Sequence, residues 1–361
     1  MFVYVGSFAY QGSEGITICK FCPETGLVEP VQTVFEEVNA GSLVKRRDIL
    51  YATDEQWDSG EEGGGRVFTF QADPENGLLT ELGHTDTMAA NTSNVTFDVD
   101  GKYMIVTHFA IGMPTIKVVA DESGQYHTQK VFPDTITSLY RMNTDGTPGK
   151  LCDVYVHPPV SFIHKAIRWG NCNQFAYCNL GADEVGFFHI DYEKEKLAMD
   201  GAVRCGRGTG PRHAVFHKTL PYLYLNYERN GVITRISCEE GNRKLVDDIS
   251  VVPEDTVMDP HCNQSEILLS GDGTRLYNLM RGLGLLNVLE VSMDTGKLKL
   301  LQTIQTESKV ARGACFSPDG KYLLVACNDT ENIVSYKVNE DGLLKECAVS
   351  GHIPHPASLA F

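Results

Sequence analysis

The sequence predicts an all-β protein built from a repeated four-strand unit. Short apolar strands recur along the chain, Asp-Gly turns precede several of them, and no stretch shows sustained helical periodicity. The strands recur at intervals of roughly 45–55 residues, a spacing typical of the blades of a β-propeller. Dividing the chain length by this interval gives about seven blades.

The recurring strand is predicted to be the second strand of each unit. It recurs at 49–55, 102–108, 174–179, 222–226, 275–279 and 321–326. Turns precede it at Asp100-Gly101, Asp272-Gly273 and Asp319-Gly320, where glycine accepts the positive φ that a tight hairpin requires. A third apolar run follows, for example at 65–70, 185–190 and 333–338, and another glycine turn leads to a more polar fourth run. Each unit is therefore predicted to be a four-stranded antiparallel sheet.

The two ends of the chain are predicted to share one blade. The segment 355–361 resembles an inner strand with nothing after it, and 2–6 resembles a second strand with nothing before it. Pairing these strands closes the ring and removes an exposed sheet edge. Residues 1–361 are then expected to form a single propeller domain.

The segment 121–161 departs from the regular strand spacing. It contains turns at 121–124 and 143–149, and it has too few apolar residues to bury a core of its own. We expect this segment to be a longer loop that lies over one face of the propeller, where loops often shape specificity.

The charge and composition argue against several classes of function. A formal net charge of −16 disfavours binding to nucleic acid or to an anionic membrane, although a local arginine cluster can still bind an anionic small molecule. The N-terminus lacks the features of a signal peptide, and no apolar run is long enough to span a bilayer. The 11 cysteines lie mostly in apolar strands, which favours reduced thiols in a cytoplasmic protein. Cys19 and Cys22 form an isolated CxxC pair, so no metal site or cofactor is expected.

Eight charged or ionisable residues lie where inner strands begin or second strands end. In a propeller these positions converge at one mouth of the central channel, although they are far apart in sequence. Such side chains are costly to bury unless they face a shared wet cavity, which favours a functional site. The candidates are Glu55, His164, Arg212, His213, Glu228, Glu266, Arg281 and Arg312.

Six motifs along the chain carry a resemblance to one protein family, namely 4–8, 50–55, 179–183, 265–267, 312–320 and Gly210-Pro-Arg-His213. By these motifs the chain resembles the lactonase family of seven-bladed propellers over nearly its whole length. That family groups propeller-type 6-phosphogluconolactonase, an enzyme of carbohydrate metabolism in the pentose phosphate pathway, with carboxy-cis,cis-muconate cyclase. The chain departs from the family pattern at Asn94, where histidine is common, and at His108 and Met280, where asparagine is usual.

The resemblance also implies a set of site residues. Positions that are catalytic in the cyclase member fall on His164, Arg212, Glu228 and Arg281, and further family positions near the channel mouth, expected to bind substrate, fall on His213, Arg312, Glu55 and Glu266. Lactone hydrolysis requires an activated water, a stabiliser for the oxyanion and anchors for an anionic substrate group. We assign acid–base chemistry to His164 and anion binding to Arg212 and Arg281. Glu228 is a second base or orients Arg212, and the alternative for these two residues is a purely structural ion pair.

The main functional hypothesis is a cofactor-free lactonase that converts 6-phosphogluconolactone to 6-phosphogluconate in the central channel. A second hypothesis keeps the same residues and makes the protein a muconate-type lactonizing cycloisomerase, in which the arginines hold carboxylates. A third hypothesis is a non-catalytic propeller that serves as a binding platform. In the two enzymatic hypotheses the partner is a small anionic molecule.

Overall fold

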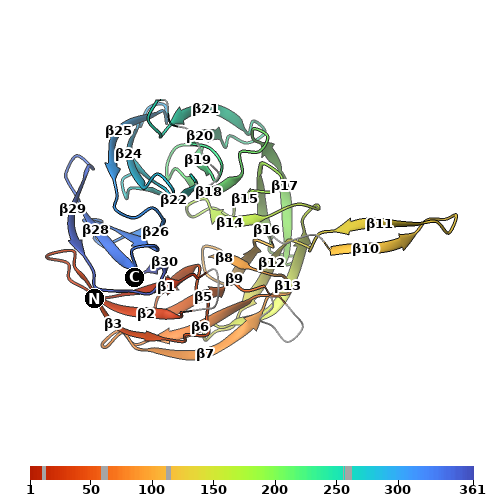
Figure 1. The fold of residues 1–361 in the computed structure, drawn as a ribbon, viewed down its shortest axis with the longest axis horizontal. Coiled ribbons are helices and arrows are strands. Elements are labelled where there is room, and N and C mark those ends of the chain that lie inside the picture. Colours follow the sequence, from red (N-terminus) through yellow and green to blue (C-terminus); the bar gives the residue numbers. More distant parts are fainter. Residues whose placement is uncertain (10–13, 58–63, 111–114, 255, 257–261) are drawn as a thin grey trace.

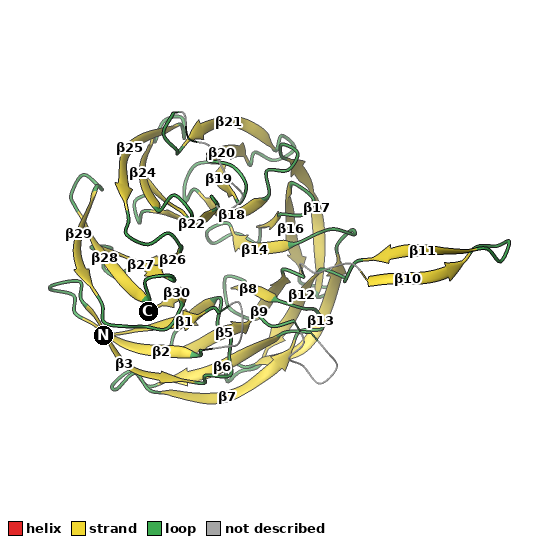
Figure 2. Cartoon of the chain, in the orientation of Figure 1, coloured by secondary structure: helices red, strands yellow, loops and turns green. Residues whose placement is uncertain are grey.

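The computed structural model describes the whole chain except residues 10–13, 58–63, 111–114, 255 and 257–261. The described part consists of strands and connecting loops, and it contains no helix (Figure 2). Seven four-stranded antiparallel sheets surround a central axis (Figure 1). This arrangement confirms the predicted seven-bladed β-propeller.

In each blade the four strands follow one another from the channel outward. The first blade comprises β30 (Pro356–Ala360), β1 (Phe2–Ser7), β2 (Ile16–Phe21) and β3 (Val28–Val34). The second comprises β4 (Leu43–Arg46), β5 (Ile49–Asp54), β6 (Arg66–Ala72) and β7 (Leu79–Asp86), and the third β8 (Thr92–Phe97), β9 (Tyr103–His108), β12 (Ile136–Met142) and β13 (Pro148–Val156). The fourth comprises β14 (Ile163–Arg168), β15 (Phe175–Asn179), β16 (Glu184–Asp191) and β17 (Lys196–Arg204), and the fifth β18 (Pro211–Phe216), β19 (Tyr222–Tyr227), β20 (Val232–Ser237) and β21 (Lys244–Ser250). The sixth comprises β22 (Gln264–Leu269), β23 (Arg275–Met280), β24 (Leu285–Val291) and β25 (Leu298–Gln305), and the seventh β26 (Ala311–Phe316), β27 (Tyr322–Cys327), β28 (Asn332–Val338) and β29 (Leu344–Val349).

The ring closes through the two ends of the chain, as the sequence predicts. Strand β1 pairs antiparallel with β30, so that Tyr4 faces Ala360 and Val5 faces Leu359. The inner strands β30, β4, β8, β14, β18, β22 and β26 each contact the inner strands of both neighbouring blades. Because the ring is closed, the inner strand of every blade lies next to the channel, which brings residues from distant parts of the chain together.

The hydrophobic core lies between adjacent blades rather than at the centre of the ring. Second strands are almost fully buried, as in β9 and β27, whereas the outer strand β25 alternates between half-buried and exposed residues. This burial pattern follows from sheets that pack face to face while their outer edges meet solvent.

A repeated hydrogen bond joins neighbouring blades. A tyrosine of the second strand donates its hydroxyl to a turn carbonyl of the adjacent blade, at O–O distances of 2.7 to 3.1 Å. The donor–acceptor pairs are Tyr4–Gly77, Tyr51–Gly146, Tyr224–Gly296, Tyr277–Gly342 and Tyr322–Glu24. Each bond satisfies two polar groups at the edge of an apolar interface, which fixes the spacing of the blades.

The expectation of a loop over 121–161 is wrong for most of that range. Strands β12 and β13 complete the third blade, and Ile136, Leu139 and Tyr140 of β12 are buried in it. The additional length belongs instead to a hairpin of β10 (Thr115–Ala120) and β11 (Tyr126–Val131), which we call the arm. The arm extends outward from the ring and does not cover a face of it (Figures 1 and 2). The sequence obscured this arrangement because the apolar residues of β12 serve the existing blade rather than a separate core.

None of the described residues forms a helix that is both long enough and apolar enough to cross a lipid bilayer.

Candidate active site

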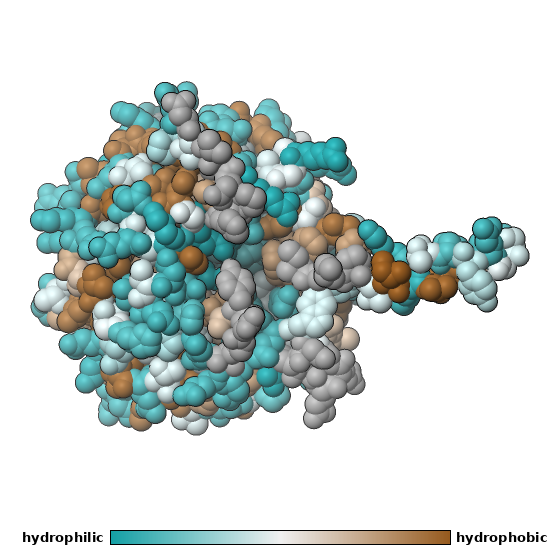
Figure 3. All heavy atoms as spheres, in the orientation of Figure 1, coloured by the Kyte–Doolittle hydropathy of each residue, from teal (hydrophilic) through white to brown (hydrophobic). Residues whose placement is uncertain are grey.

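All eight residues predicted from the sequence line the central channel, where they face two adjoining cavities. The first cavity, of about 510 Å³, is lined by Glu55, His164, Arg212, Glu228, Arg281 and Arg312. The second cavity, of about 680 Å³, is lined by His213 and Glu266, and it shares Glu55, His164, Arg212 and Arg312 with the first. Hydrophilic residues are visible at the centre of the face shown in Figure 3. The shared residues form the boundary between the two cavities.

Irregular pairing of the inner strands places four of these side chains in the channel, namely His164, Arg212, Glu266 and Arg312. The register of the inner strand shifts at His164 between Ile163 and Lys165, and it shifts again at Arg212 and at Arg312. Similar shifts occur at Ser93 and around Glu266. A β-bulge inserts an extra residue into one strand and re-aims its side chain. The same irregularity in five blades therefore directs five different side chains toward the axis.

Two arginines from different blades flank one carboxylate in the first cavity. The Nε atom of Arg212 lies 3.4 Å from Oε2 of Glu228, and a guanidinium nitrogen of Arg281 lies 4.0 Å from the same oxygen. Arg212 also donates a hydrogen bond of 2.6 Å to the carbonyl of Ser265. Because burial lowers the pKa of Arg212 and the charge of Glu228 raises it, the carboxylate offsets part of the cost of burying this cation. Arg212 thus lies between Glu228 and the Ser265 carbonyl, and its side chain lines the cavity.

Arg312 forms a further cationic group of the same cavity. Its guanidinium lies 3.5 Å from Oε2 of Glu55 and 3.7 Å from the centre of the Phe8 ring. Burial raises the pKa of Glu55, although the charges of Arg312 and Arg212 lower it. Stacking on an aromatic ring and pairing with a carboxyl group leave the other donors of the guanidinium able to bind an anion.

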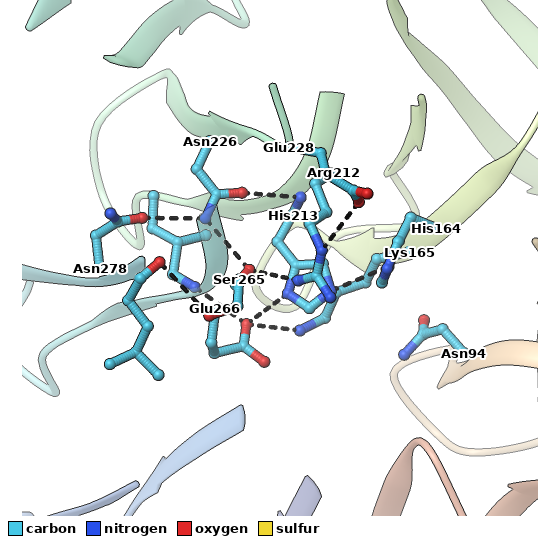
Figure 4. A network of polar contacts seen from close by, with 12 residues as sticks. Asn94, His164, Lys165, Arg212, His213, Asn226, Glu228, Ser265, Glu266 and Asn278 are labelled. Atoms are coloured by element: carbon cyan, nitrogen blue, oxygen red, sulfur yellow. Dashed lines mark hydrogen bonds and ion pairs between the residues drawn. The ribbon is translucent and has the colours of Figure 1, made fainter. Parts of the chain in front are cut away.

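The two predicted histidines contact each other. The Nε2 atom of His213 lies 3.1 Å from Nδ1 of His164, and Nδ1 of His213 lies 2.8 Å from Oε1 of Glu266 (Figure 4). The same glutamate oxygen accepts a hydrogen bond of 3.0 Å from Lys165. Burial, followed by the charge of Arg212, holds the pKa of His164 well below its ordinary value, so its imidazole is neutral near pH 7.

Buried asparagine side chains hydrogen-bond to the backbone of the strands that carry the two histidines. Asn226 accepts a hydrogen bond from the backbone N–H of His213, and it donates to Asn278 and to the carbonyl of Ser265 (Figure 4). Asn94 accepts a hydrogen bond of 3.2 Å from the backbone N–H of Ala166, which ties the third blade to the fourth. Asn94 therefore has a role in joining blades, where the family commonly has histidine.

Sequence reasoning missed several polar residues of this site, and Ser93 and Lys165 are two of them. Ser93 lines both cavities and donates a hydrogen bond of 2.8 Å to the carbonyl of Ile163. Lys165 lines the second cavity and pairs with Glu266. Both residues lie where a register shift turns an inner strand, and no residue type marks such a shift in the sequence. The one signal in the sequence was for Lys165 itself, since it is a charged residue directly after the candidate His164.

A cluster with metal-binding residue types lies outside the channel. Among the described residues, Glu14, Glu331 and His355 bring one ligand atom each within 4.8 Å of one another. Nδ1 of His355 lies 2.6 Å from the carboxylate of Glu14. These residues line neither cavity, and the contact joins the chain segments next to the closing strand.

The fold and the channel together define a seven-bladed propeller with an arginine-rich polar site on its axis. The chain belongs to the lactonase family of seven-bladed β-propellers, whose model matches residues 2–361. This membership confirms the family resemblance predicted from the sequence.

Known relatives match nearly the whole chain at modest identity. The chain is 22% identical to the 6-phosphogluconolactonase of Bacillus subtilis (strain 168) in an alignment of 363 positions, which covers 99% of this chain and 97% of the relative. It is 24% identical to the 6-phosphogluconolactonase of Formosa agariphila, with 93% of this chain and 92% of the relative covered. The structure of the periplasmic gluconolactonase PpgL of Pseudomonas aeruginosa superposes with a TM-score of 0.85 at 21% identity, over 100% of this chain and 98% of the other. At that identity the structural likeness shows the fold alone.

Proposed function

We propose that this protein is a lactonase that hydrolyses a sugar lactone bearing an anionic group, with 6-phosphogluconolactone as the substrate. The observation that carries the proposal is the first cavity, where His164 lies among Arg212, Arg281 and Arg312. A neutral histidine can act as a base, and arginines bind phosphate in a bidentate manner. The family membership and the names of the two relatives support the same activity.

The proposed reaction uses the residues of the first cavity in four roles. His164 removes a proton from water as the water oxygen bonds to the lactone carbonyl carbon, and the carbonyl electrons move onto its oxygen. Arg212 stabilises this oxyanion, and Glu228 keeps Arg212 oriented. When the oxyanion collapses, the bond to the ring oxygen breaks and His164 returns its proton to that oxygen. Arg281 and Arg312 bind the phosphate of the substrate.

A titration assay tests this proposal. Purified protein is mixed with 6-phosphogluconolactone in weak buffer at slightly acidic pH, where spontaneous ring opening is slow, and proton release is recorded. We expect release well above the protein-free rate, and a lower rate with glucono-1,5-lactone because that substrate lacks the phosphate. Release at the protein-free rate with both lactones would overturn the proposal.

A lactonizing cycloisomerase is the second candidate. The sequence resemblance places His164, Arg212, Glu228 and Arg281 on the catalytic positions of the muconate cyclase, and the structure has these four side chains around one cavity. In this reaction His164 would transfer the proton, and the arginines would hold carboxylates. Loss of the ultraviolet absorbance of a carboxymuconate would identify it. A binding platform without catalysis would show neither activity.

We also propose that the protein acts in the cytoplasm, as an enzyme of the pentose phosphate pathway. All 11 cysteines are free thiols, and several of them lie in the apolar cores of the blades. Free buried thiols suit a reducing compartment. Cell fractionation with an antibody against the native protein tests this localisation.

A further inference from the structure

Three side chains stand behind His164 on the side away from the first cavity. His213 contacts His164, Glu266 contacts His213, and Lys165 contacts Glu266, at distances of 3.1, 2.8 and 3.0 Å. All three line the second cavity and none of them lines the first. A substrate that occupies the first cavity therefore meets His164 but not the three residues behind it.

The chemistry of these groups decides where the protons lie. An ionised carboxylate only accepts hydrogen bonds, so the 2.8 Å contact with Glu266 requires a proton on Nδ1 of His213. A neutral His213 then has a lone pair on Nε2. The 3.1 Å contact between the two rings is a hydrogen bond only if Nδ1 of His164 carries a proton. The remaining nitrogen of His164, Nε2, then holds the lone pair.

Lys165 helps to keep the protons of His213 and His164 on their Nδ1 atoms. A protonated Glu266 would be able to donate to His213, which would invert both imidazoles and leave His164 without a lone pair for the substrate. Although burial alone raises the pKa of Glu266, the contacts with His213 and Lys165 more than offset this and hold the pKa well below its ordinary value. The contact with His213 and the ammonium group of Lys165 at 3.0 Å together keep the carboxylate ionised.

We infer that Glu266 and His213 are positioning residues that hold His164 in the base-competent tautomer, with its lone pair on Nε2, and that Lys165 maintains the charge of Glu266. The inference rests on the proposed role of His164 as the base of this site. When His164 accepts a proton at Nε2, its Nδ1–H remains bonded to His213, and the carboxylate behind His213 stabilises the new positive charge. No proton has to leave the three residues during the reaction. His213 and Glu266 thus act on catalysis without contacting the substrate, in place of the substrate-binding role implied by the family resemblance.

Nitrogen NMR on histidine-labelled protein tests the tautomer directly. The ring nitrogens of His164 are assigned by their loss in His164→Gln. At pH 7.5 we expect Nδ1 to carry the proton and Nε2 to have the shift of an unprotonated nitrogen. A protonated Nε2 would overturn the inference. This measurement needs no substrate, so it remains decisive even if the lactonase assay fails.

Kinetics of His213→Leu provide the second test. Leucine removes the acceptor for His164 and leaves the ion pair of Lys165 and Glu266 in place. We expect kcat to fall by about 10–100-fold with KM nearly unchanged, and His213→Gln to recover part of the loss because its side-chain oxygen can accept from Nδ1. Unchanged kcat, or a change in KM alone, would count against the inference.

A matched control lies on the outer part of the fourth blade. There His189 and Asp200 form another histidine–carboxylate contact, at 3.0 Å, away from the two channel cavities. His189→Leu should leave kcat unchanged. Circular dichroism of both leucine variants separates a positioning effect from loss of folding. If His213→Leu proves unfolded, the tautomer in the native protein still decides the question.

Discussion

Arg212 and Glu228 form an ion pair inside the channel, with Nε of Arg212 at 3.4 Å from Oε2 of Glu228. Glu228 is not paired with Arg212 alone, because a guanidinium nitrogen of Arg281 from the next blade lies 4.0 Å from the same oxygen. Both residues line the first cavity. A purely structural ion pair would have no need of a second cation or an open cavity beside it. The geometry therefore supports the functional interpretation of Arg212 over the structural one.

Replacing Arg212 with lysine should remove the proposed oxyanion contact. Lysine keeps the charge but cannot reach both the Ser265 carbonyl and Glu228 with the geometry of a guanidinium. We expect kcat for 6-phosphogluconolactone to fall by about 100-fold or more, which is typical for loss of one oxyanion donor. Proton release under saturating substrate measures this effect.

Arg235 provides a control for the loss of a buried guanidinium. It lies on β20 of the same blade and pairs with Asp247, and it lines neither channel cavity. Arg235→Lys should lower the free energy of unfolding while leaving kcat intact. Equal losses of kcat in both variants would mean that the effect of Arg212→Lys reflects the fold and not the site.

Arg312→Met should affect substrate binding more than turnover. The methionine keeps much of the packing on Phe8 but cannot bind a phosphate. We expect KM for 6-phosphogluconolactone to rise by about 10-fold or more with kcat within a small factor of wild type, because each charge-assisted contact to phosphate contributes on the order of 1.5–3 kcal/mol. The rate with glucono-1,5-lactone at low concentration should change little. A parallel loss on both lactones would show that Arg312 does not bind the phosphate.

The repeat spacing was sufficient to predict the propeller architecture. It also predicted that the eight candidate residues would lie at the channel. Strand ends in successive blades occupy equivalent places around the axis, so a position such as Arg281, directly after β23, has a predictable location. The ring closure by β30 and β1 was predictable for a similar reason, because each end of the chain lacks part of a blade.

The division of the site into two cavities could not be predicted. Consecutive residues of a regular strand point to opposite faces, whereas the register shift after Ile163 allows both His164 and Lys165 to line the channel. Similar shifts bring Arg212 and His213 to the same contact region. Such bulges depend on pairing with a neighbouring strand, which residue types alone do not encode.

Tyr224→Phe should destabilise the fold without affecting the site. The hydroxyl of Tyr224 donates a hydrogen bond of 2.8 Å to the carbonyl of Gly296 in the next blade, and Tyr224 is fully buried. Its removal leaves a buried acceptor without its donor, at a cost of about 1–3 kcal/mol. Urea unfolding measures the change, and Tyr126→Phe on the exposed arm is the control. A change below about 0.5 kcal/mol would show that this bond adds little to blade packing.

His108→Asn should make the protein less sensitive to acid. Burial lowers the pKa of His108 to about 4, although a hydrogen bond from Nδ1 to the carbonyl of Ile136 raises it. Between the ordinary histidine pKa near 6.5 and this value, the unfolded chain binds a proton that the folded chain does not, so stability falls as the pH falls through this window. From pH 8 to pH 5, His108 alone should account for a loss of about 2 kcal/mol.

Urea unfolding of wild type and variant at pH 8 and pH 5 measures this effect. The difference in unfolding free energy between the two pH values should be smaller in His108→Asn by about that amount. His127→Asn, on the exposed strand β11, is the control and should behave like wild type. The same pH dependence in wild type and His108→Asn would show that protonation of His108 costs the folded state no free energy relative to the unfolded chain.

Removal of the arm should leave the propeller folded and active. The arm is a two-stranded hairpin that stands off the ring (Figures 1 and 3). Its residues Ile116, Val118 and Tyr126 are 54%, 69% and 76% exposed. Since Thr115 pairs with Val131, their backbones are close enough for a short Gly-Asn-Gly turn to replace residues 115–131. We expect a change in Tm of less than about 3 °C and an unchanged kcat, because the third blade keeps all four of its strands.

Deletion of residues 356–361 is the contrasting variant, since it removes the inner strand of the first blade and should abolish cooperative unfolding. A large fall in Tm on removal of the arm would show that the hairpin packs against the ring in solution.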